Sequence, residues 1–265
     1  MHSKPTFGSD IVVVQVTLFQ IDNYGPWTVT PEPYPESDLQ ALQADLYADL
    51  SRAVGTHDGT AFPTRFDNVV AVTDGMDRLD HDRLVETIAN RYPVTVSAGV
   101  GADPRPADAL VAATAALQGA GSAQDGDRQR VLRGEPGDAG TVRIAHFDVV
   151  AATDRYTDAV SAYDSLLSVR AAGDRLMRLL YDRHDALTFF VGGDNLIAVV
   201  PDLPDRAYER AVDRVADATG VDLKVGVGAG ATGREAGLEA KHALERCRER
   251  ATTVERAAPV ADADD

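Results

Sequence analysis

The sequence predicts an α+β protein made of two tandem ferredoxin-like domains, each with the element order βαββαβ and an antiparallel sheet. Two observations support this fold class. The chain of 265 residues contains an internal repeat, and each copy shows the same order of strand-like and helix-like segments. We place the first domain at 1–120, a linker at 121–140, the second domain at 141–256 and a disordered acidic tail at 257–265.

The repeat rests on three landmarks that occur in the same order at nearly constant spacing. The pair Asp67-Asn68 precedes an apolar run and recurs as Asp194-Asn195, 127 positions later. Asp22 closes a β-rich segment, and Asp148 closes another 126 positions later. The third landmark is a β-branched run that ends in alternating glycines, at Val94–Gly101 and Leu223–Gly230. The order and spacing predict a duplicated domain.

Each element of the first copy follows from hydrophobic periodicity. Alternating β-branched residues predict strands, and apolar residues three or four positions apart predict helices. A short polar segment between two apolar runs predicts a hairpin. The expected elements are strand Ile11–Gln20, helix Ser37–Ala53, hairpin Ala61–Thr73, helix Arg78–Asn90, strand Val94–Gly101 and helix Ala107–Gln118.

The second copy shows the same patterns in the same order. Its hairpin contains two consecutive glycines, and its last strand again ends in alternating glycines. The expected elements are strand Val142–Val149, helix Ala159–Tyr181, hairpin Leu187–Val200, helix Asp205–Thr219, strand Leu223–Ala229 and helix Glu235–Arg250.

Composition excludes several classes of function. The chain carries 26 Lys plus Arg against 42 Asp plus Glu, a net charge of −16, which disfavours nucleic acid or an anionic membrane as a partner. Abundant Asp and scarce Lys indicate a halophilic protein whose acidity reflects its solvent. The lone Cys247 excludes an intramolecular disulfide and a multi-thiolate zinc site. No secretory signal or membrane-length apolar run is present, so we expect a cytoplasmic protein.

Two pairs of aspartates are candidate metal ligands. The first strand and the central hairpin strand are neighbours in a ferredoxin-like sheet, so Asp22 should approach Asp67, and Asp148 should approach Asp194. Adjacent carboxylates repel each other unless a cation lies between them, and their oxygens suit Mg²⁺. The alternative is that each Asp forms a turn or caps a helix, as an Asp after a strand often does.

Three residues near the second pair suggest how a substrate is held. Gly192 and Gly193 permit positive φ and the close approach of a ligand, although they also suit an ordinary hairpin turn. His146 lies two residues before Asp148 and therefore on the same strand face, where it is a candidate general base or phosphate donor. The alternative role of His146 is that of a surface residue of the sheet.

Two resemblances specify the chemistry. The hairpin Gly192–Asn195, with Phe147-Asp148 upstream, resembles the Gly-Gly-Asp-Glu-Phe diguanylate cyclases and the wider palm and nucleotide cyclase folds, but Asn195 stands where an acidic residue is expected. Roughly residues 11–250 resemble the archaeal GTP cyclohydrolase III family more closely. The motifs that carry this resemblance are Gln20–Pro31, Glu36–Gln43, Thr64–Asn68, Asn90–Pro93, Gly121–Asp125 and Gly192–Asn195.

The family resemblance implies a GTP hydrolase. Such enzymes open the guanine imidazole ring at C8, retain the formyl group and cleave the triphosphate, giving 2-amino-5-formylamino-6-ribosylamino-4(3H)-pyrimidinone 5′-monophosphate. It also implies two or more Mg²⁺ ions, K⁺ as an activator, neither zinc nor an organic cofactor, and a homo-oligomer (dimer or tetramer). Our candidates are His146, Asp148 and Asp194 for catalysis, Asp22, Asp67, Asp148 and Asp194 for metal, and Asn23, Arg65, Asn68, Gly192, Gly193 and Asn195 for substrate.

Several alternatives remain open at the level of sequence. A nucleotide cyclase or dinucleotide synthase on the same fold would use the same carboxylates. A degenerate tandem domain that only senses GTP would keep the fold without turnover. Either one copy is catalytic and the other is a binding or assembly partner, or the two copies share one site.

Overall fold

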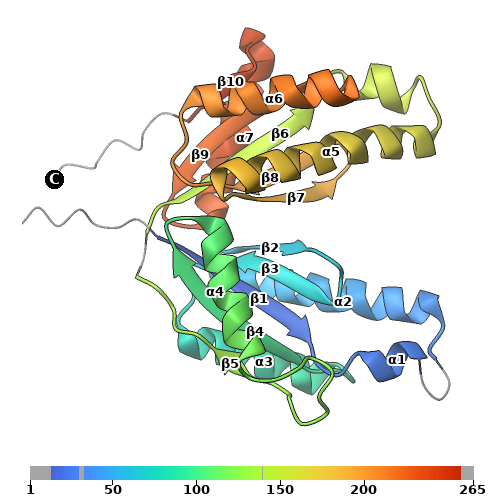
Figure 1. Ribbon diagram of the computed structural model, residues 1–265, viewed down its shortest axis with the longest axis vertical. Coiled ribbons are helices and arrows are strands. Elements are labelled where there is room, and N and C mark those ends of the chain that lie inside the picture. The colour runs from blue at the N-terminus through green and yellow to red at the C-terminus, as the bar shows by residue number, and fades with distance from the viewer. Residues whose placement is uncertain (1–12, 30–32, 139, 258–265) are drawn as a thin grey trace, which may run out of the picture.

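The computed structural model describes residues 13–29, 33–138 and 140–257, which form two five-stranded sheets with helices on both sides (Figure 1). The predicted acidic tail, beyond Ala257, lies outside the described residues. Among the described residues, no helix is long and apolar enough to cross a membrane. The strand order of each sheet confirms the predicted fold class.

The first sheet has the order β2-β3-β1-β4-β5. Its first four strands are antiparallel neighbours with the ferredoxin-like connection. The expected hairpin and helices are present, and the short helix α1 after the first strand was not predicted. The elements are β1 (Val14–Ile21), α1 (Gly25–Val29), α2 (Glu36–Gly55), β2 (Thr60–Pro63), β3 (Asn68–Val72), α3 (Arg78–Arg91), β4 (Val96–Asp103), α4 (Pro106–Gln118) and β5 (Leu132–Arg133).

The second sheet has the order β10-β9-β6-β8-β7 and repeats the topology of the first. Its elements are β6 (Val142–Val149), the π-helical turn η1 (Thr153–Thr157), α5 (Ala162–His184), β7 (Leu187–Gly192), β8 (Asn195–Val199), α6 (Asp205–Thr219), β9 (Leu223–Gly230), α7 (Gly233–Arg250) and β10 (Val254–Arg256). Helix α5 begins later than expected because Ser161 caps it, accepting a hydrogen bond from the Asp164 amide.

One feature differs from the prediction of purely antiparallel sheets. Each sheet gains a fifth strand that runs parallel to its neighbour, β5 beside β4 and β10 beside β9. Strand β5 lies within the segment 121–140 that we interpreted as a linker, so this segment is in part a component of the first sheet. Strands of two and three residues are too short to show alternation, and for that reason the sequence did not reveal them.

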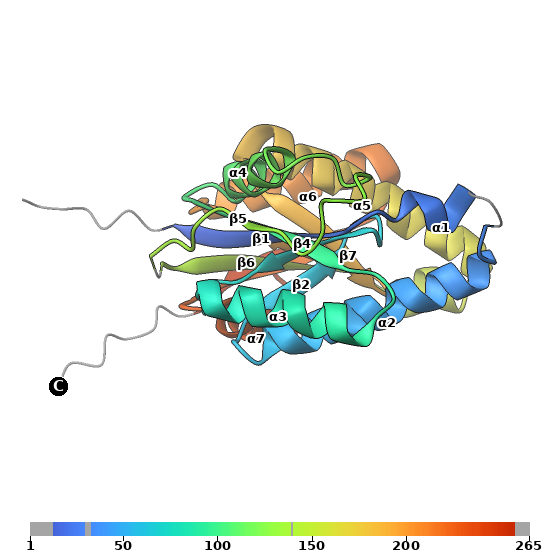
Figure 2. The same ribbon diagram turned by 90° about the horizontal axis from the view of Figure 1, so that it is seen from below.

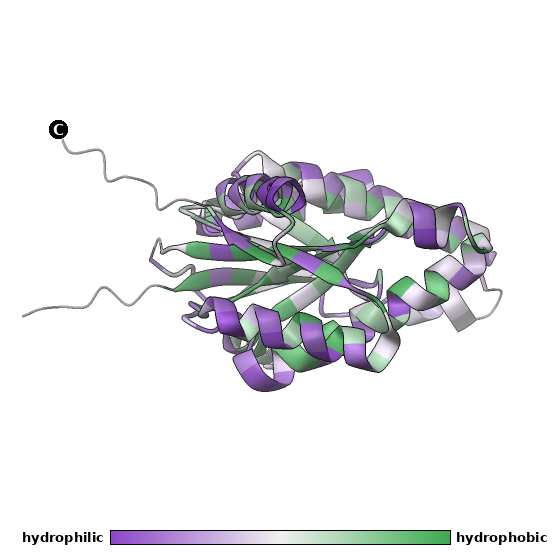
Figure 3. Ribbon diagram, turned by 90° about the horizontal axis from the view of Figure 1, so that it is seen from above, coloured by the Kyte–Doolittle hydropathy of each residue, from purple (hydrophilic) through white to green (hydrophobic). Residues whose placement is uncertain are grey.

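The two halves share a hydrophobic interior. Helices α2 and α3 cover one face of the first sheet, and α5 and α6 cover one face of the second, on the opposite side of the molecule (Figures 1 and 2). A third cluster joins the halves, and within it the rings of Phe62 and Phe189 stack with their centroids 4.3 Å apart. Hydrophobic residues accordingly concentrate in the strands, while hydrophilic residues mark the outer helices (Figure 3).

Glycines let α4 and α7 closely approach the remaining faces of the two sheets. A Cβ on Gly99 would lie 2.2 Å from the carbonyl oxygen of Ala113 in α4, and one on Gly226 would lie 2.2 Å from that of Ala240 in α7. These contacts are too short for any side chain. The alternating glycines of the repeat are therefore required by helix packing.

Asp74 makes the stability of the first half depend on pH. Its Oδ1 accepts a hydrogen bond from the Gln15 amide at 3.0 Å, and its Oδ2 is buried without a partner among the described residues. Burial raises the pKa of Asp74 to about 7. The folded state therefore binds the Asp74 proton more tightly than the unfolded state does. The protonated carboxyl contributes its full stability to the folded state at low pH, and this contribution is lost as pH rises from about 4 to about 7.

We predict that Asp74→Asn is more stable relative to wild type at pH 8 than at pH 5, because the amide stays neutral over this range whereas the Asp74 carboxyl loses its proton. The difference in unfolding free energy between variant and wild type should grow by on the order of 2 kcal/mol from pH 5 to pH 8. Urea unfolding at fixed KCl measures it, with Asp38→Asn, on the exposed surface of α2, as the control for loss of one charge. A difference that does not change with pH would contradict the prediction.

Candidate active site

Asp148 is a buried carboxylate near the end of β6. The register of the sheet places it opposite Asn195 of β8 on one side and Lys224 of β9 on the other. Arg248 of α7 donates a hydrogen bond from Nη2 to Oδ2 of Asp148 at 2.9 Å, while Lys224 donates to the carbonyl oxygen of Cys247. The other oxygen, Oδ1, has no hydrogen-bond partner among the described residues.

Asp194 lies in the turn between β7 and β8 and shares the electrostatic environment of Asp148. Burial, followed by the negative charge of Asp148, raises the pKa of Asp194 above its ordinary value. Asp194 follows Gly192 and Gly193, whose φ angles are 111° and 61°. A Cβ on Gly192 would meet no atom within 4 Å, so the turn combines a backbone conformation that favours glycine with open space beside a carboxylate.

Asn195 and His146 are linked to this turn by hydrogen bonds. The Asn195 amide nitrogen donates to Oδ1 of Asp194 at 3.0 Å, so its oxygen points toward Nε2 of His146, 2.9 Å away. An amide oxygen only accepts, and His146 therefore carries a proton on Nε2. The nitrogen of His146 that remains for proton transfer is Nδ1.

The corresponding turn of the first half is neutralised by its own arginine. Arg65 donates two hydrogen bonds to Asp67, at 2.7 and 3.3 Å, and Asn68 donates a third at 3.0 Å. The residue of the second half that corresponds to Arg65 is Gly192, 127 positions later, so the turn of Asp194 contains no arginine. The two turns occupy the same place in the repeated hairpin, but only in the second is the carboxylate not paired with an arginine of its own turn, and so able to bind a ligand.

The sheet register corrects the predicted equivalence of Asp22 and Asp148. Gln20 pairs with Asn68 in the first sheet, as Asp148 pairs with Asn195 in the second. Gln20 is therefore the counterpart of Asp148, and Asp22 lies two residues further along. A slip of two residues keeps a side chain on the same strand face, so sequence periodicity could not detect it.

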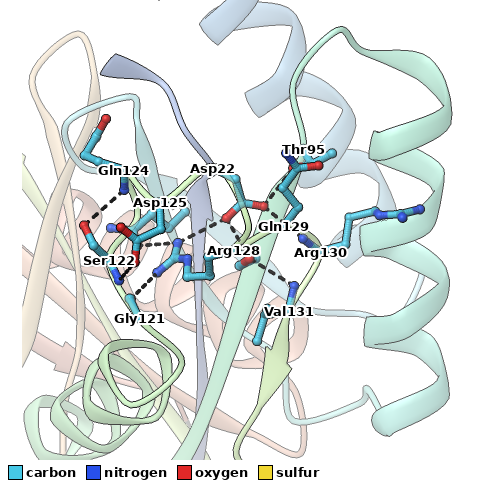
Figure 4. A network of polar contacts seen from close by, with 12 residues as sticks. Asp22, Thr95, Gly121, Ser122, Gln124, Asp125, Arg128, Gln129, Arg130 and Val131 are labelled. Carbon is cyan, nitrogen blue, oxygen red and sulfur yellow. Dashed lines mark hydrogen bonds and ion pairs between the residues drawn. The ribbon is translucent and has the colours of Figure 1, made fainter. Parts of the chain in front are cut away.

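Asp22 instead forms a buried ion pair with Arg128 (Figure 4), and the exposed fractions of the two side chains are 1% and 3%. Nη2 of Arg128 and the Ser97 hydroxyl donate to Oδ1 of Asp22 at 3.1 and 2.7 Å. The Thr95 hydroxyl and the Arg130 amide donate to Oδ2 at 2.8 and 3.0 Å. Protein donors thus occupy both oxygens of Asp22, and this arrangement gives no support to a metal-ligand role.

Asn23 belongs to the same network. It adopts a left-handed conformation with φ of 48°, and its backbone N–H donates to the carbonyl oxygen of Ala123, with N and O 2.6 Å apart. Gly25 then donates to the side chain of Gln124 at 2.9 Å. The segments around Asp22 and Gly121–Asp125, which carry two of the motifs found in the sequence, thus hold each other in place.

A cleft of about 1040 Å³ runs between the two halves. Its walls are the β2–β3 turn, strand β7 and one face of α5. It brings Arg65 of the first half and Gly192 of the second to one space, with Arg170 over the Phe190 ring at 4.9 Å from the centroid. The hydroxyl of Thr188, also in the lining, is buried without a partner among the described residues.

The structure therefore gathers some of the predicted site residues and separates others. His146, Asp148, Asp194 and Asn195 form one cluster, with Gly192 and Gly193 in its turn. Arg65, Asp67 and Asn68 form another around the first turn, and Asp22 and Asn23 belong to the buried network. Sequence reasoning missed Arg248, Arg128 and Arg170, whose partners are known only after folding, and Thr188, whose burial in the cleft wall is known only then.

The donor set at Asp148 and Asp194 suits a magnesium ion shared with a phosphate ligand. Among the described residues there is no group of three or more His, Cys, Asp or Glu side chains able to enclose a metal ion. Mg²⁺ commonly uses one or two carboxylates and completes its shell with water and substrate phosphate. Burial is the main cause of the raised pKa of Asp194 and the charge of Asp148 is the second, and a divalent cation would offset both.

Comparison with known proteins gives a consistent family match. Residues 14–262 match the family model described as GTP cyclohydrolase III. A protein named GTP cyclohydrolase III 1 from Halobacterium salinarum is 57% identical over 247 residues, covering 91% of this chain and 97% of its own. GTP cyclohydrolase III from Methanocaldococcus jannaschii is 45% identical over 238 residues, covering 89% and 88%.

Solved structures give a weaker likeness. The GGDEF domain of DgcB from Caulobacter crescentus, in complex with c-di-GMP, has a TM-score of 0.38 and 12% identity, covering 44% of this chain and 78% of that one. A bacterial light-regulated adenylyl cyclase covers 91% of this chain and 84% of its own at a TM-score of 0.33. The fold assignment therefore rests on the strand order of the two sheets.

We predict that Asp22→Asn or Arg128→Met destabilises the protein by about 3–5 kcal/mol, because either change leaves the partner's charge buried and unpaired. Denaturant unfolding at constant salt measures this effect. The exposed pair Arg155 and Asp222 provides the control, since Arg155→Met should cost at most about 1 kcal/mol. Equal costs for the buried and exposed pairs would show that the Asp22 network is not structural.

Proposed function

Because the chain belongs to the GTP cyclohydrolase III family, we propose that it hydrolyses GTP at a site formed by Asp148, Asp194 and the cleft between the two halves. The enzyme is a metal-dependent GTP cyclohydrolase. The observation that supports this site most directly is the asymmetry of the two turns. Arg65 neutralises Asp67, whereas no arginine stands in the turn of Asp194, which accepts from Asn195, and the space beside Gly192 is open.

The substrate lies with its triphosphate at the β7–β8 turn and its guanine in the cleft. Gly192 lines the cleft and precedes Asp194 by two residues, so the turn connects the two parts of the site. Arginines on both sides supply phosphate contacts, Arg65 from the first half and Arg170 from the second. The unpartnered Thr188 hydroxyl is available to a polar edge of the base.

Asp148 and Asp194 hold the metal, for which we propose Mg²⁺, with two or more ions when GTP is bound. When bound there, such ions would supply positive charge for the phosphate oxygens and would lower the pKa of a water molecule. Arg248 holds Oδ2 of Asp148, which orients the carboxylate and leaves Oδ1 for the ligand. We further propose K⁺ as the monovalent activator.

Two hydrolytic events account for the product. One water adds at C8, the bond between C8 and the ribose-bearing nitrogen breaks, and the formyl group stays on the other imidazole nitrogen. A second water cleaves the triphosphate and leaves a monophosphate. His146 positions Asn195 through Nε2, and its Nδ1 is the atom available to accept a proton from water. Asn68, Asn195 and Asn23 remain candidate substrate contacts.

Incubating the purified protein with GTP, MgCl₂ and molar KCl, followed by mass spectrometry, tests the proposed reaction. The expected product is one water heavier than GMP, and the purine absorbance should disappear. A cyclic phosphodiester with an intact purine would identify a nucleotide cyclase instead. Tight GTP binding without turnover would identify a sensor. The proposals of a cytoplasmic location and a homo-oligomer are independent of this experiment.

We predict that Asp148→Asn and Asp194→Asn each lower kcat/KM by at least about a hundredfold, because each removes a negatively charged metal ligand worth several kcal/mol in the transition state. Steady-state assays over a range of Mg²⁺ concentrations measure the effect, with circular dichroism to check the fold.

Asp67→Asn is the matched control, since Asp67 occupies the same place in the first turn. We expect kcat/KM of this variant to stay within a few-fold of wild type. If Asp67→Asn were inactive and Asp194→Asn active, the first half would carry the metal site.

A further inference from the structure

A second pocket, of about 380 Å³, lies between helices α5 and α6. The two helices lie side by side, and α5 ends beside the start of α6 (Figure 1). The linings of this pocket and of the cleft have no described residue in common. The pocket is rich in positive charge although the chain carries a net charge of −16. Its basic residues are Arg183, His184, Arg206, Arg210 and Arg214.

The four arginines of the pocket have no carboxylate partner among the described residues. The carboxylates that flank the pocket along the chain are each bound by an arginine from outside its lining. These ion pairs are Asp185 with Arg105, Asp202 with Arg143 and Asp205 with Arg256. The fold has thus neutralised its own nearby carboxylates elsewhere and has left the guanidinium groups of the pocket able to bind a ligand.

The arginines of α6 are placed where the helix itself gains nothing from them. Arg206, Arg210 and Arg214 are four residues apart, so their like charges lie on one side of the helix and repel each other. Arg206 also stands in the first turn of α6, where the helix dipole disfavours a cation. Helix stability therefore does not account for this row of arginines, whereas an anion bound beside it would.

The floor of the pocket is apolar, and its exposed arginines form the rim. Low polarity beneath the rim strengthens the attraction between the arginines and a bound anion. The pKa of His184 is lowered by burial and, second, by the charge of Arg183, so its imidazole is mainly neutral at pH 7. The buried residues of the floor are Leu179, Leu203, Ala207 and Ala211.

We propose that this pocket binds a polyphosphate anion, a chain of phosphate groups that is either free or esterified to an organic group. Guanidinium groups match phosphate oxygens with two parallel hydrogen bonds. The row from Arg206 to Arg214 extends for about 12 Å, because a helix rises about 1.5 Å per residue, so it suits a chain of phosphates better than a single one. A chain of three phosphates carries about four negative charges near neutral pH, which the four arginines balance.

A nucleic acid does not fit this surface. Exposed carboxylates stand on the same two helices, at Asp182, Glu209 and Asp213, and they would repel a phosphate backbone that runs beyond the pocket. Molar salt also screens long-range attraction, so binding depends on direct contacts inside the pocket. The inference is independent of the proposed GTP hydrolysis, because it concerns a different pocket and is measured without Mg²⁺.

Isothermal titration calorimetry with tripolyphosphate and with ATP, in molar KCl and EDTA, tests the pocket. The wild type should bind one equivalent of at least one of these probes. Arg210→Gln should raise the dissociation constant at least about tenfold, because it removes a charged contact with two hydrogen bonds. Binding of ATP alone would assign the esterified anion, and equal binding of the two probes would assign the free phosphate chain.

Two control variants remove one positive charge elsewhere. Arg83→Gln lies on the exposed surface of α3, and Arg170→Gln lies in the wall of the cleft. Both should leave the dissociation constant within about twofold of wild type. No binding by the wild type, an unchanged constant for Arg210→Gln or an equal loss in either control would overturn the proposal. Equal binding of an oligo-aspartate peptide would also overturn it, because the pocket would then recognise carboxylates rather than phosphate.

Discussion

The antiparallel register of β6 with β8 governs the candidate site. It sets Asp148 opposite Asn195, and it therefore brings the carboxylate at the end of one strand to the turn that carries Asp194. Burial, followed by the negative charge of Asp148, raises the pKa of Asp194. The sheet fixes the backbone at Asp148 and Arg248 holds its Oδ2, so this carboxylate stays beside the turn. A divalent cation would offset both the burial of Asp194 and the charge of its neighbour, and a polyphosphate could share that cation.

The first half has the same fold but lacks the pair of neighbouring carboxylates. Gln20 replaces the acidic residue at the paired position, and it donates to the Asn68 side chain at 3.0 Å. The turn carboxylate Asp67 is bound by Arg65. The most buried charges of this half are instead those of the Asp22–Arg128 pair, and their burial indicates a role in holding the fold together. One copy of the duplicated domain has thus kept its carboxylates available, while the other has used its carboxylates to fix loops.

Local patterns in the sequence were sufficient for the long elements. Helix α3 was predicted almost to the residue, and its first turn carries a capping box between Asp77 and Asp80. Local patterns did not predict the features that depend on which strands and residues pair in the folded chain. Strand β5 contains only two residues, and Asp22 was matched to Asp148 because a slip of two residues preserves the strand face. Arg248 lies 100 residues from Asp148, and Arg128 lies 106 residues from Asp22, so neither ion pair has a local signal. The carboxylates of the site could be selected from sequence, but their partners could not.

Duplication also explains why the cleft requires both halves. Its walls come from the β2–β3 turn, strand β7 and α5. The edge strands β2 and β7 meet beside it, where Phe62 stacks on Phe189. Each of these strands would be an unpaired edge in an isolated half, exposed to unwanted pairing. Packing the two edges together with an apolar stack protects both and leaves a space beside them that neither half could enclose alone. Gly192 lies at the end of this space, and it begins the turn that carries Asp194. The packing that stabilises the tandem fold is therefore the same packing that places a large cleft beside the β7–β8 turn.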